Sequence, residues 1–98
     1  MKLSALQKYI LLEVLQHKGK YYKKDLLNYY KDKDKKPSKE DQFNIITKSV
    51  ERMIDKGLLI GYGRKTPEKM FIKRLRLTDE GRKTAIKIRQ SKQQKFNI

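Results

Sequence analysis

Apolar residues recur at helical spacing near the start of the chain. Leu6, Ile10 and Val14 repeat every fourth residue, and Ser4 with a glutamine three residues later forms a capping-box pattern. A first helix is therefore expected to begin at Ser4. Gly19 stands where a left-handed residue commonly follows a helix C-terminus, so we expect the helix to end there.

Two further helices are predicted within the first 56 residues of the chain. Leucines and tyrosines indicate a short helix over residues 23–33, after a strand-like or extended link at Tyr21 and Tyr22. A charged run ending at Pro37 forms a connector. Ser38 is a suitable N-cap for a long helix over 39–56, which Gly57 ends. Its inward side is expected to carry Phe43, Ile46, Val50 and Met53.

The second half of the chain predicts a β-hairpin and a last helix. Residues 58–62 and 70–77 are typical of two strands, separated by a turn rich in glycine, proline and cations. Thr78 is an N-cap for a helix over about 79–93. Because a two-stranded ribbon is not stable alone, it must lie against the helices. The predicted fold class is α+β, mainly α: a three-helix core, a two-stranded ribbon and a C-terminal helix.

Composition removes several classes of function. The 98 residues suffice for one domain, expected to span 1–98, and they include no Cys and only one His, His17. Disulfides, thiol catalysis and Cys-based zinc sites are thereby excluded, and the acidic pairs both stand at predicted helix starts, where the helix dipole explains them. No apolar run approaches a membrane span. We expect no enzyme activity, no cofactor, no metal and no membrane partner, and a cytoplasmic, nucleoid-associated location.

The charge balance points to an anionic polymer as partner. The formal net charge is +15, from 26 Lys and Arg against 11 Asp and Glu. Residues 71–98 are the most one-sided, with nine basic and two acidic residues. A charge of this size in a small domain is typical of nucleic-acid binding.

Two motifs in order carry a resemblance to a known family. Residues 49–60 (SVERMIDKGLLI) run from a helix through Lys-Gly into a strand, and residues 76–82 (RLTDEGR) leave a strand for a helix through Leu-Thr-x-x-Gly. With the preceding helices, this pattern resembles the MarR/PadR-like winged-helix transcription regulators of bacteria and archaea, over about residues 4–90. Compact winged helices of this kind occur in viruses as well. The resemblance implies a winged helix-turn-helix that binds double-stranded DNA, with helix 39–56 as the recognition helix.

The outward side of helix 39–56 carries residue types suited to the major groove. Asn and Gln pair with adenine, Lys and Arg with guanine or phosphate, and a Thr methyl contacts the thymine methyl. The hairpin, over about 61–70, is expected to place cations on the flanking backbone or in the minor groove. The candidate DNA-binding residues are Gln42, Asn44, Thr47, Lys48, Arg52, Arg64, Lys65 and Lys69.

A homodimer is expected from surplus apolar surface. Leu11, Leu12 and Leu15 fall outside the first stripe of the first helix, which indicates cover on a second side. The predicted dimer interface consists of Leu12 together with Ala85, Ile86 and Ile88 of the last helix. One C-terminal helix and little apolar surface make a small-molecule effector unexpected.

Other interpretations of the sequence remain open. The high charge also suits a nonspecific architectural DNA-binding protein, and a winged helix can act as a protein-interaction module without binding DNA. The tyrosines at 21, 22, 29 and 30 could stack on single-stranded bases, although their spacing favours packing at the edge of the core. A small nuclease is the weakest alternative, since His17 is alone and the carboxylates are dispersed.

Overall fold

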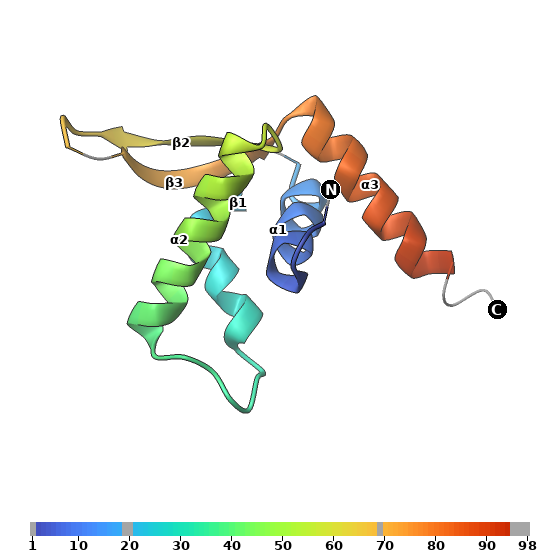
Figure 1. Ribbon diagram of the computed structural model, residues 1–98, viewed down its shortest axis with the longest axis horizontal. Helices are drawn as coiled ribbons and strands as arrows, with labels where there is room; N and C mark the ends of the chain where they lie inside the picture. Colours follow the sequence, from blue (N-terminus) through green and yellow to red (C-terminus); the bar gives the residue numbers. More distant parts are fainter. Residues whose placement is uncertain (1, 19–20, 69, 95–98) are drawn as a thin grey trace.

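The structure is a computed structural model that describes residues 2–18, 21–68 and 70–94. Helices and strands follow the order α1 (Ala5–Gln16), β1 (Tyr21–Tyr22), η1 (Lys23–Tyr30), α2 (Lys39–Asp55), β2 (Leu59–Lys65), β3 (Met70–Leu77) and α3 (Asp79–Gln94). In Figure 1, α1 lies between α2 and α3, and the β2–β3 hairpin projects from the body beyond α2.

The sheet has three strands, not the two that the sequence predicted. The strand order is β1-β3-β2, and both pairings are antiparallel. Tyr21 pairs with Leu75, and both side chains are buried in the core. The link before η1 therefore becomes a short edge strand, because burying the Tyr21 ring brings its backbone alongside β3. The hairpin runs from the Leu59–Leu77 pair to the Lys65–Met70 pair, with a bulge at Tyr62 and Gly63.

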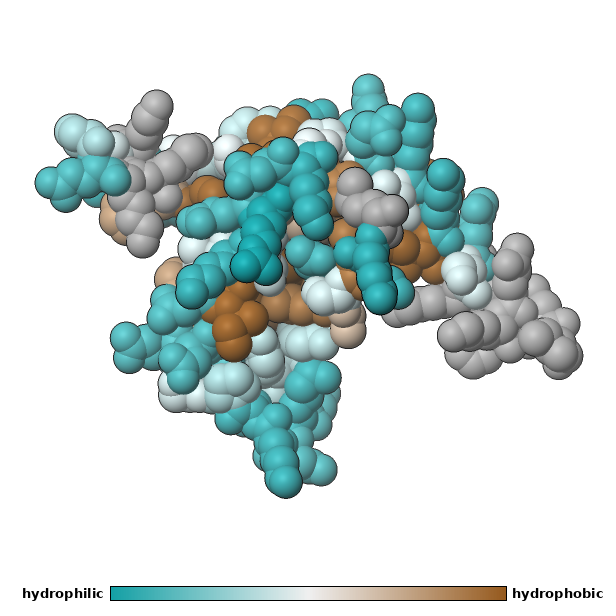
Figure 2. Space-filling model, viewed as in Figure 1, coloured by the Kyte–Doolittle hydropathy of each residue, from teal (hydrophilic) through white to brown (hydrophobic). Residues whose placement is uncertain are grey.

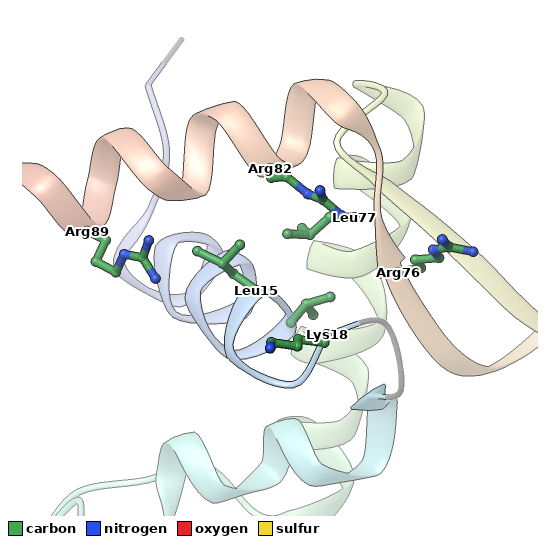
Figure 3. Close-up of a pocket in the computed structure, with 7 residues that line it drawn as sticks. Leu15, Lys18, Arg76, Leu77, Arg82 and Arg89 are labelled. Carbon is green, nitrogen blue, oxygen red and sulfur yellow. The ribbon is translucent and has the colours of Figure 1, made fainter.

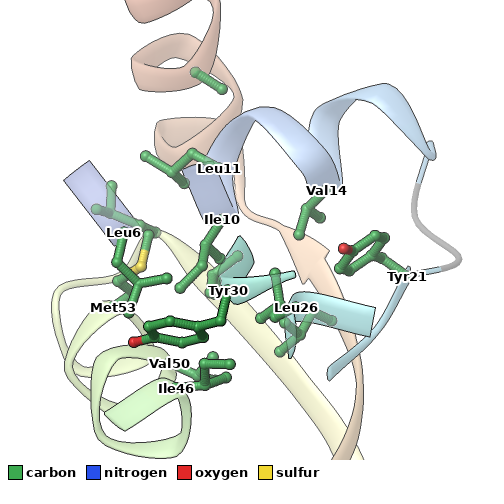
Figure 4. Packing of buried hydrophobic residues seen from close by; sticks show 14 residues of the cluster. Leu6, Ile10, Leu11, Val14, Tyr21, Leu26, Tyr30, Ile46, Val50 and Met53 are labelled. Carbon is green, nitrogen blue, oxygen red and sulfur yellow. The ribbon is translucent and has the colours of Figure 1, made fainter. Parts of the chain in front are cut away.

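One apolar core joins all of these elements (Figure 4). Fourteen buried apolar residues form it, and α1 contributes four of them: Leu6, Ile10, Leu11 and Val14. Leu75 of β3 and Ala85 of α3 close the core from the other side, and both have no exposed surface. Leu11 is thus used within one subunit, although the sequence assigned it to surplus surface.

The helix ends follow the predicted capping chemistry with two exceptions. Ser4 accepts from the Gln7 amide and forms the complete capping box. The left-handed residue after α1 is Lys18, with φ of 47°, whereas Gly19 lies outside the described residues. The second helix is a 3-10 helix that ends at Tyr30, three residues before the predicted end. Its conformation was not apparent from spacing, because 3-10 and α-helices bury similar apolar stripes over two turns.

The tyrosines serve mainly as packing residues. Tyr21 and Tyr30 are buried, and the Tyr29 ring lies 5.0 Å from that of Tyr9. Burial and the neighbouring Glu13 raise the pKa of Tyr9 to about 12 and raise the pKa of Tyr21 as well. Because their rings are buried or packed against one another, base stacking finds little support here except at the exposed Tyr22.

The Leu-Thr-x-x-Gly motif ties the end of α2 to the start of α3. Thr78 Oγ1 donates to the Gly57 carbonyl at 2.6 Å and accepts from the Gly81 amide at 2.9 Å. Gly57 itself has φ of 75°, which ends α2 as predicted. A Cβ at Gly81 would collide with the Leu58 carbonyl oxygen. The glycine is therefore required by a close helix-to-backbone approach.

Gly81→Ala is expected to lower the free energy of unfolding by about 1–3 kcal/mol, because the added methyl forces the backbones of α3 and Leu58 apart. Urea denaturation followed by circular dichroism measures the loss. Lys83→Ala, two residues later on the exposed side of α3, serves as the control and should stay within about 0.5 kcal/mol of the parent protein. Equal stability of the two variants would contradict the close approach.

Candidate nucleic-acid interface

The buried stripe of α2 differs by one residue from the predicted one. Gln42, Ile46, Val50 and Met53 are buried, at spacings of four, four and three residues. Gln42 was expected to face outward, but it is only 7% exposed and its Nε2 donates to the Pro37 carbonyl at 2.8 Å. The aliphatic part of Gln42 covers the first turn of α2. Its side-chain amide gives the Pro37 carbonyl, in the segment before the helix, a hydrogen-bond donor.

Phe43 was expected to point inward, and it is 46% exposed instead. It follows Gln42 by about 100° around the helix, which places it between the buried stripe and the outward face. The Lys23 ammonium lies 4.4 Å from the centroid of its ring, a cation–π contact. Lys23 Nζ also donates to Thr47 Oγ1 at 3.0 Å, so Thr47 is half-buried and engaged with η1. Thr47 is therefore less available to DNA than Asn44, Lys48 and Arg52, the other α2 residues that were predicted to contact DNA and are exposed.

The outward face of α2 keeps the remaining candidates. Asn44, Lys48 and Arg52 are exposed, as predicted, and no described hydrogen bond or ion pair holds their side chains. They lie on successive turns, and Glu51 is exposed beside them. The face is polar and mixed in charge.

The hairpin contacts α2 near its base. Ile54 of α2 and Ile72 of β3 both approach Gly61, where a Cβ would stand 3.0 Å from Ile54 Cδ1. Arg64 is exposed on the projecting part of β2. Lys65 pairs with Met70 in the ladder, but its side chain, like the whole of Lys69, lies outside the described residues. Of the three predicted hairpin cations, Arg64 alone can thus be placed.

A groove separates α2 from the sheet, and sequence reasoning did not find it. Its volume is about 500 Å³, and it is lined by Tyr22, Lys23, Lys24, Phe43, Thr47, Glu51, Phe71, Ile72 and Lys73. These residues come from four elements, so their meeting depends on tertiary packing. One hint was present in the sequence: three residues before Ile46, Phe43 could lie either on the buried side of α2 or just outside it. Figure 2 shows apolar patches between hydrophilic side chains on the visible face.

A second hollow, of about 590 Å³, lies between α1, β3 and α3 (Figure 3). Arg82 and Arg89 of α3 and Lys18 after α1 surround the apolar side chains of Leu15 and Leu77. Arg76 and Val14 complete its lining, which includes no acidic residue among those described. This is a concentrated basic surface beside the predicted dimer region.

The predicted dimer interface requires one correction. Ala85 has no exposed surface, because α3 packs on α1 of the same subunit and uses it in the core. It cannot also contact a partner. Leu12, Ile86 and Ile88 are half-buried and keep surface available, so the homodimer stays a prediction that rests on them.

Within the described part of the chain, no three His, Cys, Asp or Glu side chains converge as metal ligands. His17 Nδ1 lies 2.8 Å from the Glu13 carbonyl and 3.6 Å from its carboxylate, which suits a residue at a helix end. None of the helices in the described ranges is long and apolar enough to span a membrane.

Gln42→Ala is expected to cost about 1–3 kcal/mol in unfolding free energy, because the Pro37 carbonyl loses its donor and the first turn of α2 loses its cover. Asn44→Ala, two residues later and exposed, is the matched control and should change stability by less than about 0.5 kcal/mol. Thermal and urea denaturation measure both. If Asn44→Ala destabilised the protein and Gln42→Ala did not, the burial of Gln42 in α2 would be contradicted.

Solved structures with the same backbone arrangement include a protein that is named a repressor. The crystal structure of the adhesin competence repressor AdcR from Streptococcus pyogenes superposes with a TM-score of 0.69 over 98% of this chain, at 17% identity. A mutant form of ZitR from Lactococcus lactis gives 0.70 over 99% of this chain, at 12% identity. This chain spans 61% and 57% of those two chains.

No protein-family model matches the sequence, and no curated protein matches it significantly. The likeness therefore concerns the backbone, and at these identities it shows the fold alone. The chain has the α+β winged-helix fold that its sequence predicted, with the β2–β3 hairpin as the wing.

Proposed function

We propose that this protein binds double-stranded DNA as a winged-helix regulator, with α2 in the major groove and the β2–β3 wing on the flanking backbone or minor groove. The observation that carries the proposal is the exposure of Asn44, Lys48 and Arg52 on α2, whose side chains make no hydrogen bond or ion pair with the described residues, beside a projecting wing that exposes Arg64. The close approach of Ile54 to Gly61 joins α2 to the base of the hairpin.

The residue types supply both affinity and selectivity. Lys and Arg neutralise phosphates and release counterions, which accounts for most of the affinity of a protein with net charge +15. Asn44 can pair with adenine and Lys48 with guanine, so the face can distinguish base pairs. A role in transcription is supported by the fold shared with AdcR, which is named a repressor.

A homodimer would present two α2 helices to half-sites about one helical turn apart. Leu12, Ile86 and Ile88 offer the half-exposed apolar surface for it. The cations around Leu15 and Leu77 would then border the contact, so the dimer should weaken at low salt through like-charge repulsion.

A second candidate function is nonspecific, architectural DNA binding. The observation that favours it is the basic hollow formed by Lys18, Arg76, Arg82 and Arg89, on elements other than α2. Two separate basic surfaces would allow one protein to contact two DNA segments. In that case Arg82→Ala and Arg89→Ala would weaken binding, and the preference among duplex sequences would be small.

Lys48→Ala and Arg64→Ala are each expected to weaken binding to a mixed-sequence duplex and to lower the slope of log affinity against log salt by up to about 1, since each removes one positive charge from the proposed DNA-binding surface. Fluorescence anisotropy over a salt series measures both quantities. Lys87→Ala on α3 is the control, because it makes the same change of charge away from α2 and the wing.

The proposal predicts a larger loss for Lys48→Ala and Arg64→Ala than for Lys87→Ala. Equal losses in all three variants would indicate attraction by overall charge and favour the architectural function. Absence of binding by the parent protein at low salt would contradict DNA binding altogether and favour a protein-interaction module.

A further inference from the structure

The groove between α2 and the sheet gathers three exposed aromatic side chains. Tyr22 is 48% exposed, Phe43 46% and Phe71 48%, the highest values among the large apolar residues described. Exposed apolar side chains that stand singly need no explanation, whereas a gathered set marks a binding surface. Exposure of three aromatic rings to water is unfavourable, so a ligand that covers them would bind more tightly.

Phe43 connects this groove to the outward face of α2. It shares a helical row with Thr47, which also lines the groove, and its next neighbour in sequence is the exposed Asn44. Phe43 stands in the first half of α2, the part that meets base edges in helix-turn-helix proteins. A DNA strand lying along α2 would pass Asn44 on one side and Phe43 on the other.

The lining of the groove is basic, although Lys23 is only 7% exposed. Lys23, Lys24 and Lys73 line it against a single carboxylate among the described residues, that of Glu51. An anionic chain that carries apolar groups complements such a surface better than a neutral apolar peptide does. In B-DNA, the C5 methyl group of thymine is the apolar group displayed in the major groove, and phenylalanine is among the side chains that contact it.

We propose that Phe43 is a specificity-determining residue that contacts thymine methyl groups in the major groove and gives the protein a preference for thymine-bearing sites. This inference rests on the proposed function, because it requires α2 in the major groove. Lys23 holds the ring in place through its 4.4 Å cation–π contact while its ammonium is hydrogen-bonded to Thr47. The Phe43 ring is thus oriented before DNA arrives, which lowers the entropy lost on binding.

The expected effect is measurable. Burial of one methyl group contributes about 0.8 kcal/mol, which corresponds to about a fourfold change in affinity for each thymine that Phe43 contacts. Because this contribution is not electrostatic, the ratio should persist as salt lowers the overall affinity.

The experiment compares two duplexes of about 30 base pairs, roughly three helical turns. They have the same A·T-rich sequence, and one carries uracil in place of every thymine, which removes the methyl groups and keeps the pairing. The parent protein should bind the thymine duplex at least about fourfold more tightly. Phe43→Ala and Phe43→Gln should bind both duplexes equally. Ile60→Ala, which removes a 39% exposed aliphatic group outside the groove, should keep the parent ratio.

The outcomes separate the inference from the proposed function. If the parent protein binds both duplexes tightly and equally, DNA binding stands and the role of Phe43 is overturned; an apolar peptide would then be the better occupant of the groove. If both Phe43 variants keep the parent's ratio of affinities for the two duplexes, the role of Phe43 is also overturned. Loss of stability alone cannot imitate the expected result, because a destabilised variant would lose affinity for both duplexes and keep their ratio. No binding to either duplex would overturn the proposed function itself.

Discussion

The orientation of α2 depends on how both of its ends are tied to the rest of the chain. At its C-terminal end, Thr78 binds the Gly57 carbonyl, and Gly81 lets α3 approach the Leu58 carbonyl closely. At its N-terminal end, Gln42 binds the Pro37 carbonyl. The two hydrogen bonds are directional, and together with the buried stripe of Ile46, Val50 and Met53 they constrain which side of α2 faces solvent. The inferences about the outward face depend on this orientation.

Polar and aromatic contacts then divide the exposed residues of α2 into two groups. Lys23 engages Thr47 and the Phe43 ring, and it joins this side of the helix to η1 and the groove. Asn44 and Lys48 have no such contacts among the described residues and face solvent. The surface therefore combines side chains suited to hydrogen bonding with an apolar strip beside them, and these are the two kinds of contact through which proteins distinguish bases in the major groove.

Most of the fold could be predicted from the sequence, because the helices and strands are marked by local chemistry. Ser4 and Gly57 mark helix boundaries, and the Leu-Thr-x-x-Gly motif marks the exit from the wing. Properties that depend on tertiary contacts were missed. Gln42, in place of Phe43, extends the buried stripe of α2 toward its N-terminus, where its amide donates to the Pro37 carbonyl. Likewise, the third strand at β1, the burial of the α3 alanine and the aromatic groove appear only when distant segments meet.

Amide chemical-shift mapping can test whether α2 and the wing form the DNA-binding surface. A ¹⁵N-labelled sample would be titrated with a mixed-sequence duplex, and the shift of each backbone amide followed. We expect the largest changes in α2 between Phe43 and Arg52 and in the wing around Arg64. Largest changes around Arg82 and Arg89 of α3, with α2 unaffected, would contradict it and place DNA on the other basic surface.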